Sequence, residues 1–172
     1  MNSSKLYDLI NRCDVLRPIF IGVFARNNIP TKELSKRKSW AMIINLDKFS
    51  QPGTHWVAVF APKNKKYLEY FDSTGRMASH YSIKKLLRQR EYYIYNNIPL
   101  QSKYTTTCGQ YCLFFLCGRA HGLQPHEIIS FFKHDNRIFN DRFVNRAVQS
   151  IFNTKLKLVN IDFIKSLIER NY

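Results

Sequence analysis

Residues 104–120 read YTTTCGQYCLFFLCGRA, in which a cysteine stands behind three threonines and opens an almost unbroken apolar run. The run over 108–118, or slightly beyond, is apolar on every side, which predicts a helix buried on all faces. Any of the threonines at 105–107 can act as its N-cap. The N-terminus of a buried helix carries a positive partial charge, and a thiol there ionises easily. Cys108 is therefore a candidate nucleophile.

The segments around this helix predict an α+β fold. Short stretches rich in β-branched and aromatic residues predict strands in PIFIGVF (18–24), SWAMIINL (39–46), HWVAVFA (55–61) and KYLEYFD (66–72). Helical patterns occur in a first helix capped by Ser3 or Ser4, in SIKKLLRQR (82–90), PHEIISFFK (125–133), RIFNDRFVNRAVQSIF (137–152) and IDFIKSLIER (161–170). Strands in the middle and helices at the end, without regular alternation, favour α+β over a βαβ repeat.

The third and fourth strands predict a hairpin that joins a histidine to a carboxylate. If PKNK (62–65) is the turn, Val59 pairs with Leu68 and His55 lies directly opposite Asp72. Directly opposed residues share a face of the sheet, close enough for an imidazole–carboxylate hydrogen bond. Glu69 has the opposite parity and should point away from His55.

A thiolate nucleophile needs a histidine beside it, and the histidine needs a third group to orient it. His55 and Asp72 supply that pair for Cys108. Attack on a carbonyl also needs donors to the oxyanion, for which the backbone N–H of Cys108 and the side chain of Gln101, the only side-chain amide in the preceding loop, are candidates. Taken singly, each residue has a structural explanation, because a cysteine in an apolar helix is usually a small core residue. The combination favours catalysis.

The other cysteines do not predict a disulfide scaffold or a metal site. Three of the four cysteines lie within ten positions of one segment, which favours reduced thiols. Cys108, Cys112, Cys117 and His121 can be written as a ligand string. On one continuous helix, however, the last two lie roughly 180–220° round from the first, so the four cannot converge on one ion unless the helix breaks. No metal is expected.

The length and charge of the chain limit the classes of protein to which it can belong. The 172 residues, 45% of them hydrophobic, predict a single domain over residues 1–172. The N-terminus lacks the pattern of a secretion signal and the longest apolar run is too short to span a membrane, so we expect a soluble intracellular protein without membrane contact. A net charge of +15 favours a polyanionic partner, most commonly nucleic acid, although a solvated basic surface without a partner is the alternative.

The ordered motifs resemble those of the adenovirus endoprotease (adenain) and its relatives in the SUMO-specific protease clan. They are His55–Trp56, Asp72, Gln101 and Cys108–Gly109, in that order. The seven-residue step from Gln101 to Cys108 looks more like adenain, whereas YFDS (70–73) looks more like the SUMO proteases. The resemblance covers roughly residues 16–118.

The resemblance implies the α+β cysteine-protease fold of that clan: a small mixed sheet packed on a central helix that bears the nucleophile, with a helical C-terminal part. It implies Cys108 as nucleophile, His55 as general base, Asp72 as its orienting group and Gln101 in the oxyanion hole, with Trp56 packed near the site. The implied reaction is hydrolysis of a peptide bond after glycine, in Gly-Gly or Gly-X-Gly sites, through an acyl-enzyme.

The family also implies a biological setting. Adenain-like enzymes mature capsid and core precursors inside the virion and the host cell, at a nuclear or cytoplasmic assembly site, assisted by DNA and a tethered basic peptide. DNA is a candidate activator here, bound without regard to sequence. A covalent peptide activator is not expected, because residues 73–107 contain no cysteine to tether it. We expect a monomer that needs no cofactor for its chemistry.

Two rivals remain open. One is a SUMO or ubiquitin deconjugating protease of the same clan. The other is a non-catalytic DNA-binding protein of a virion core, which the net charge of +15 favours.

Overall fold

The computed structural model describes residues 1–30, 34, 37–51, 53–153, 162 and 166. Its elements are, in chain order, α1 (Ser3–Ile10), β1 (Phe20–Ala25), β2 (Trp40–Asn45), β3 (Trp56–Ala61), β4 (Tyr67–Phe71), α2 (Tyr81–Leu87), β5 (Tyr92–Tyr95), α3 (Cys108–Ala120), α4 (Pro125–Ser130) and α5 (Arg137–Asn153). No helix in the described part of the chain is both long enough and apolar enough to cross a membrane.

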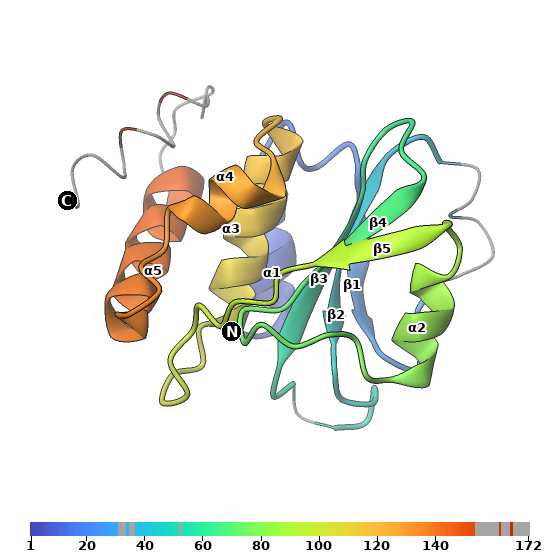
Figure 1. Ribbon diagram of the computed structural model, residues 1–172, viewed down its shortest axis with the longest axis horizontal. Helices are drawn as coiled ribbons and strands as arrows, with labels where there is room; N and C mark the ends of the chain where they lie inside the picture. The colour runs from blue at the N-terminus through green and yellow to red at the C-terminus, as the bar shows by residue number, and fades with distance from the viewer. Residues whose placement is uncertain (31–33, 35–36, 52, 154–161, 163–165, 167–172) are drawn as a thin grey trace.

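The five strands form one mixed sheet in which the spatial order follows the chain order, β1-β2-β3-β4-β5. The central pairs β2–β3 and β3–β4 are antiparallel, whereas the outer pairs β1–β2 and β4–β5 are parallel. The predicted small mixed sheet is confirmed. As Figure 1 shows, α3 and α1 lie on one face of this sheet and α2 lies on the other.

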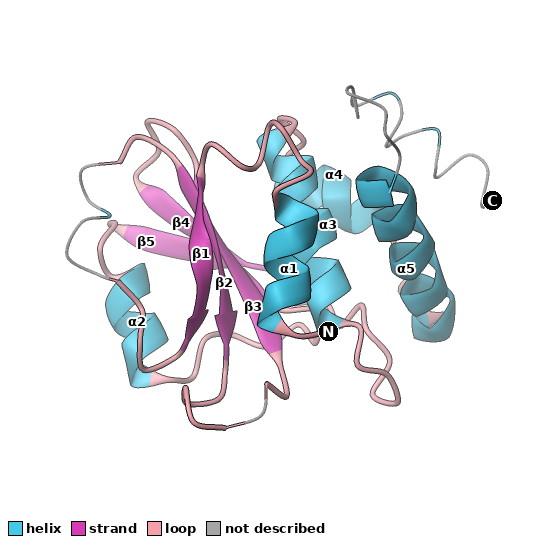
Figure 2. Ribbon diagram, turned by 180° about the vertical axis from the view of Figure 1, so that it is seen from behind, coloured by secondary structure: helices cyan, strands magenta, loops and turns pink. Residues whose placement is uncertain are grey.

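Each face of the sheet has its own hydrophobic core. Successive side chains of β3 point to opposite faces. Ala58 and Phe60 pack toward α3, and Val57 and Val59 pack toward α2. The helices α4 and α5 lie on the side of α3 away from the sheet, so α3 is enclosed between two layers (Figure 2). This enclosure explains why the sequence of α3 is apolar all round.

The prediction of a buried central helix is confirmed. Of the residues in α3, all except Gln110 and Ala120 are buried. The ring of Phe115 stacks on Phe71 of β4 with centroids 4.5 Å apart, which fixes the helix against the strand that precedes Asp72. The helix begins at Cys108, as predicted, at the end of the sheet where β3 begins and β4 ends.

The predicted hairpin register is wrong by two residues. Val59 pairs with Tyr70 rather than Leu68, and Phe60 pairs with Glu69. Asn64 adopts a left-handed backbone with φ of 60°, which Asn tolerates, and the turn is centred one residue later than predicted. His55 and Asp72 are therefore not directly opposed. A shift of two residues keeps parity, however, so both side chains remain on the same face.

Three smaller predictions differ from the structure or lie outside it. The strand β5 was not predicted, and the side chain that caps α1 is Asn2, which accepts from the Lys5 N–H at 3.0 Å, rather than Ser3 or Ser4. The helix predicted over 161–170 lies outside the described residues, apart from 162 and 166.

Candidate active site

His55 and Asp72 form a hydrogen-bonded pair at one end of the sheet. His55 immediately precedes β3 and Asp72 immediately follows β4, so the hairpin brings the two together. The Nε2 atom of His55 lies 2.8 Å from Oδ1 of Asp72. The carboxylate side chain is 3% exposed and the imidazole 22% exposed, so the imidazole is the partner that an external molecule can reach.

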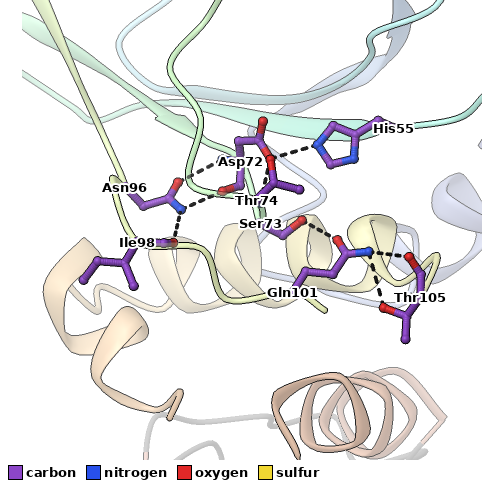
Figure 3. A network of polar contacts seen from close by, with 8 residues as sticks. All are labelled: His55, Asp72, Ser73, Thr74, Asn96, Ile98, Gln101 and Thr105. Atoms are coloured by element: carbon purple, nitrogen blue, oxygen red, sulfur yellow. Dashed lines mark hydrogen bonds and ion pairs between the residues drawn. The ribbon is translucent and has the colours of Figure 1, made fainter. Parts of the chain in front are cut away.

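The Asp72 carboxylate is oriented by the turn that follows it (Figure 3). Its Oδ1 atom accepts from the Thr74 N–H at 2.8 Å and from the Thr74 hydroxyl at 2.7 Å. Gly75 completes this turn with φ of +73°, and a Cβ there would meet the backbone N of Pro99 at 2.6 Å. The turn therefore packs directly on the chain that leads to Gln101.

The backbone of Asp72 is held by Asn96, which follows β5. The Asp72 N–H donates to Oδ1 of Asn96 at 2.9 Å, and Nδ2 of Asn96 donates back to the Asp72 carbonyl at 2.6 Å and to the Ile98 carbonyl at 3.2 Å. Beyond the last β4–β5 backbone pair, the side chain of Asn96 therefore makes the hydrogen bonds that a further strand residue would make through its backbone. It fixes Asp72 where β4 ends.

Cys108 and His55 hydrogen-bond through their side chains and perturb each other's protonation. Burial opposes the charged imidazole, but the hydrogen bonds to Asp72 and Cys108 outweigh it and raise the pKa of His55 to about 9. Burial likewise opposes the thiolate. The hydrogen bonds to Cys108 from His55 and from the backbone of Trp56 and Gly109 nevertheless lower the pKa of its thiol. Both shifts favour a thiolate–imidazolium pair.

The side chain of Gln101 is held by hydrogen bonds to Ser73 and Thr105. Its Oε1 atom accepts from the Ser73 hydroxyl at 2.6 Å, and its Nε2 atom donates to the Thr105 carbonyl at 2.8 Å. Because Ser73 follows Asp72 directly, Gln101 is tied to the hairpin on one side and to the threonine loop on the other (Figure 3). The structure brings His55, Asp72 and Cys108 into contact and leaves Gln101 one loop away.

The threonines before Cys108 do not cap the helix with their side chains. Thr107 occupies the N-cap position, yet its hydroxyl makes no capping hydrogen bond. It donates instead to Oδ1 of Asp141 at 3.0 Å, and the Thr105 hydroxyl donates to Oδ2 of Asp141 at 2.8 Å. The expectation that a threonine side chain caps this helix is wrong, and the first backbone N–H groups of α3 stay clear of side-chain acceptors from the threonines.

Asp141, on α5, is a residue that the sequence analysis missed. Its buried carboxylate also accepts from the Tyr111 hydroxyl at 3.0 Å and from the Ser102 N–H at 3.2 Å. Asp141 therefore holds the loop before Cys108 against α5 by hydrogen bonds. A sequence signal existed, since Asp141 and Asn140 are polar residues on the apolar face of a helix, but nothing in the sequence identifies their partners. The hydrogen bonds that Asn96 makes to Asp72 have no corresponding pattern in the sequence.

A cleft opens beside the site, along the indole of Trp56. It is lined in part by Met1, Val23, Phe24, Phe49 and Gly53. The side chain of Trp56 is buried, as the resemblance implied for a residue packed near the site. A Cβ at Gly109 would lie 3.3 Å from Met1, so the glycine after Cys108 lets the N-terminal residue approach the start of α3.

Solved structures share this arrangement of sheet and helices. The chain superposes on the ASFV pS273R protease with a TM-score of 0.51 at 19% identity, covering 74% of this chain and 59% of that protein. It superposes on the SUMO protease Ulp1 with a TM-score of 0.50 at 15% identity, covering 87% of this chain and 78% of the other. The chain has the fold of the SUMO-protease clan of cysteine proteases. The fold expected from the motifs is thereby confirmed.

Sequence comparison gives a partial match to a viral protein. A stretch of 100 residues is 35% identical to the putative thiol protease R355 of Acanthamoeba polyphaga mimivirus, covering 52% of this chain. The match spans 33% of the mimivirus protein, so most of that relative has no counterpart in the alignment. No family model matches the chain.

Proposed function

We propose that this protein is a cysteine endopeptidase that cleaves viral structural precursors after glycine during virion maturation. The observation that carries the proposal is the contact of Cys108 with a histidine that is itself hydrogen-bonded to a buried carboxylate at 2.8 Å. The SUMO-protease fold and the similarity to a mimivirus protein described as a thiol protease support it.

The geometry suits acyl transfer. Nε2–H of His55 is donated to Asp72, which leaves the other ring nitrogen for Cys108. The Cys108 thiolate attacks the carbonyl carbon, and the imidazolium gives its proton to the leaving amine as the acyl-enzyme forms. His55 then takes a proton from water, which attacks the thioester and releases the acid. Asp72 holds the tautomer and stabilises the imidazolium.

The oxyanion hole is assigned to the start of α3 and to Gln101. The backbone N–H of Cys108 lies at the positive end of a buried helix, where a developing negative charge is stabilised. Gln101 supplies the second donor through the N–H that does not bond to the Thr105 carbonyl. Its hydrogen bond from Ser73 sets the amide orientation, with nitrogen toward the threonine loop.

Cleavage after glycine rests on the adenain-like motifs, and the cleft along Trp56 is the proposed channel for the residues that precede the cut. The proposed substrates are capsid or core precursors, with processing in the virion or at its assembly site in the host cell. DNA is proposed as a sequence-independent activator.

A deconjugating protease is the second candidate. It is favoured by the superposition on the SUMO protease Ulp1, which covers more of this chain than the viral protease does, 87% against 74%. A panel of Gly-Gly-X and Gly-X-Gly peptides, assayed beside SUMO and ubiquitin adducts, separates the two candidates.

The experiment that tests catalysis is labelling with a peptide vinyl sulfone, followed by mass-spectrometric mapping. We expect a single adduct on Cys108, lost in His55→Ala at the same pH, and cleavage of glycine-containing peptides. An unlabelled Cys108 in folded protein contradicts the proposal and favours the non-catalytic DNA-binding alternative.

A further inference from the structure

A second cluster of reactive side chains lies at the other end of α3. The sulfurs of Cys13 and Cys117 are 3.9 Å apart, and a ring nitrogen of His121 lies within 4.8 Å of both. Cys13 follows α1, whereas Cys117 lies in the last turn of α3 and His121 is the C-cap of that helix, four residues further on and on the same face. Cys117 is fully buried and Cys13 nearly so.

We propose that Cys13, Cys117 and His121 bind a zinc ion. Two thiolates and an imidazole are the ligand types that Zn²⁺ prefers in proteins. Zn–S bonds of about 2.3 Å at a tetrahedral angle place two sulfurs roughly 3.8 Å apart, and the observed separation is 3.9 Å. The two sulfurs, which in the metal-free protein can share a hydrogen bond, therefore already have the spacing of the bound state.

One ring nitrogen of His121 carries an independent sign of a missing partner, whereas the ring also hydrogen-bonds to the thiol of Cys13. The Nε2 atom of His121 is buried and has no hydrogen-bond partner among the described residues. Buried polar atoms are almost always satisfied, so an unpaired one calls for a ligand. His121 as a whole is only partly buried, which leaves room for water as the fourth ligand.

The ligand set differs from the one considered from the sequence. Cys108 and Cys112 are not part of it, in agreement with their positions round the helix. The third ligand comes from the segment after α1, which only the fold brings to α3. The backbone at Cys13 is fixed by its N–H to the Ile10 carbonyl at 2.9 Å and by the Arg17 N–H to its own carbonyl at 2.9 Å. The His121 N–H donates to the Cys117 carbonyl at 3.0 Å, so all three protein ligands lie on hydrogen-bonded backbone.

The ion would act on structure rather than on the proposed proteolysis. Cys117 lies nine residues along the helix from Cys108, about 13 Å at 1.5 Å per residue. A bound ion would join the end of the α1 segment to the end of α3. At its other end, the same segment places Met1 against Gly109 beside Cys108. The zinc site therefore fixes α1 along the whole central helix.

The test uses the full chain carrying Cys108→Ala, so that metal binding at Cys108 and His55 does not contribute. Anaerobic titration with Co²⁺ should give one equivalent with thiolate charge-transfer absorption and tetrahedral d–d bands, displaced by Zn²⁺, and Zn²⁺ should raise the Tm. Adding Cys13→Ser or His121→Ala should weaken binding more than about 100-fold, beyond the roughly 10–100-fold typical of lost outer-shell partners. Cys112→Ser, a buried cysteine of the same helix outside the cluster, is the matched control and should keep the full affinity.

Three outcomes overturn the proposal. One is the absence of Co²⁺ charge-transfer absorption in the parent protein. Another is unchanged affinity in Cys13→Ser and in a His121→Ala protein whose circular dichroism matches that of the parent. The last is a Cys13–Cys117 disulfide, mapped without reduction, in protein that has never been exposed to oxidant. Activity of the Cys108-containing enzyme is not a readout, so this result stands apart from the proposed protease function.

Discussion

The protonation of Cys108 and that of His55 depend on each other. The pKa of the imidazole is raised to about 9 and that of the thiol is lowered, through a hydrogen bond that they share. In the proposed mechanism, loss of His55 removes both the acid and the group that lowers the pKa of the Cys108 thiol, whereas loss of Cys108 removes the nucleophile. Each catalytic proposal at this scale can be tested by a single substitution.

We predict a bell-shaped dependence of kcat/KM on pH, with its alkaline limb near the His55 pKa of about 9. As pH rises through that value the imidazolium loses its proton, and the leaving amine has no acid. The acid limb lies below the ordinary pKa of a thiol, because the pKa of Cys108 is lowered. Alkylation of Cys108 by iodoacetamide needs only the thiolate, so its rate should not fall across the alkaline limb. Parallel loss of both rates would contradict the assignment.

Cys108→Ala should abolish turnover while leaving the circular dichroism spectrum and the Tm close to those of the parent. Cys112→Ala is the control, because Cys112 is fully buried one turn further along the same helix. It should lower the Tm and leave turnover per folded molecule nearly unchanged, since it removes core volume but no reacting group. Measurable turnover in purified Cys108→Ala would refute the mechanism.

Asp72→Asn should lower kcat by orders of magnitude, because the amide cannot stabilise the imidazolium or hold its tautomer. It should also move the alkaline limb to lower pH, since the hydrogen bond that raises the His55 pKa is weakened. A shift of the alkaline limb distinguishes a lowered His55 pKa from a general loss of structure, which would lower kcat without moving the limb. An unmoved limb would show that Asp72 does not act through His55.

Glu69→Gln is the contrasting substitution on the opposite face of β4. Glu69 forms a buried two-bond ion pair with Arg119, at 2.6 and 2.8 Å, and does not contact His55. Leaving one member of a buried pair uncompensated costs about 3–5 kcal/mol. We therefore expect a lower midpoint of urea unfolding with turnover per folded molecule preserved. Comparable losses of turnover in the Glu69 and Asp72 variants would overturn the assignment of the two faces.

The pairing of His55 with Asp72 was predictable from sequence even though the hairpin register was not. Parity along a strand has a period of two, so a shift of two residues moves no side chain to the other face. The position of the turn was not predictable in the same way. The sequence does not show at which residue the strand pairing ends, and so it does not show that Asn64 adopts the left-handed conformation. Gln101 was predictable as a loop amide, but its bonds to Ser73 and Thr105 depend on tertiary contacts.

At the scale of elements, the start of α3 is held by a contact from α5. The Asp141 carboxylate binds the hydroxyls of Thr105, Thr107 and Tyr111 and the N–H of Ser102. Threonine is common at N-caps, so the sequence favours capping. The Thr107 hydroxyl donates to the buried carboxylate, and in that orientation its oxygen accepts from no helix N–H. Local propensity is overridden by a partner 34 residues away.

Asp141→Asn should lower kcat by about tenfold to a hundredfold, less than the loss of an oxyanion donor, which costs about 10²–10³. The reason is that the amide cannot accept every hydroxyl that now fixes the loop carrying Gln101 and Cys108. The matched control is Asn145→Ala, which breaks a different α3–α5 hydrogen bond, from Gln110 at 2.9 Å, without touching the loop. KM for a short peptide should change little. Equal kcat values in the two variants would assign Asp141 to stability alone.

The edge strand β5 shows where element prediction failed. Its sequence, YYIY, is short and mostly exposed, so it has neither the length nor the buried face that marked the other strands. It forms because β4 offers an open edge and because Asn96 continues the pairing beyond the last strand residue. Neither cause can be read from residues 92–95.

At the scale of the whole molecule, two exposed basic clusters stand out. The backbone N–H of Glu91 donates to the Lys66 carbonyl at 2.9 Å, which sets the chain after α2 against the β3–β4 turn. The turn carries the exposed residues Lys63, Lys65 and Lys66, and α2 with its C-cap carries Lys84, Lys85 and Arg88. Lys66 also forms an ion pair with Glu91 at 2.8 Å, so part of the charge of the turn is balanced within the protein.

We predict sequence-independent DNA binding that weakens with salt, with a log–log slope of about −0.9 per phosphate contact. Lys84→Glu with Lys85→Glu should weaken binding and flatten the slope. Lys5→Glu with Arg17→Glu, an equal charge change on α1 and the turn after it, is the control and should have a smaller effect. Cleavage of a protein substrate should rise with DNA at low salt and lose that stimulation as salt increases. Undetectable binding at low ionic strength would assign the charge to another polyanion.

The fold class was predictable because α3 and the strands β1 to β4 have strong patterns. An all-apolar helix between β-rich and helix-rich segments can only be buried between a sheet and other helices, which is the observed layering (Figure 1). The assembly of α1, α3 and α5 around distant polar residues was not predictable, since Cys13, Asn96 and Asp141 meet their partners across long separations in the chain.

The carboxylate that holds the threonine loop belongs to the last complete helix that the structure describes. During synthesis, the β3–β4 hairpin with His55 and Asp72 leaves the ribosome first, then Cys108, and Asp141 only after 33 further residues, as residue numbers count them. A nascent chain that ends before Asp141 therefore has the proposed nucleophile, base and orienting acid but no Asp141 carboxylate to accept from the hydroxyls of Thr105 and Thr107. The order of translation itself delays the fixing of the loop that carries the proposed oxyanion donor until most of the chain has been made.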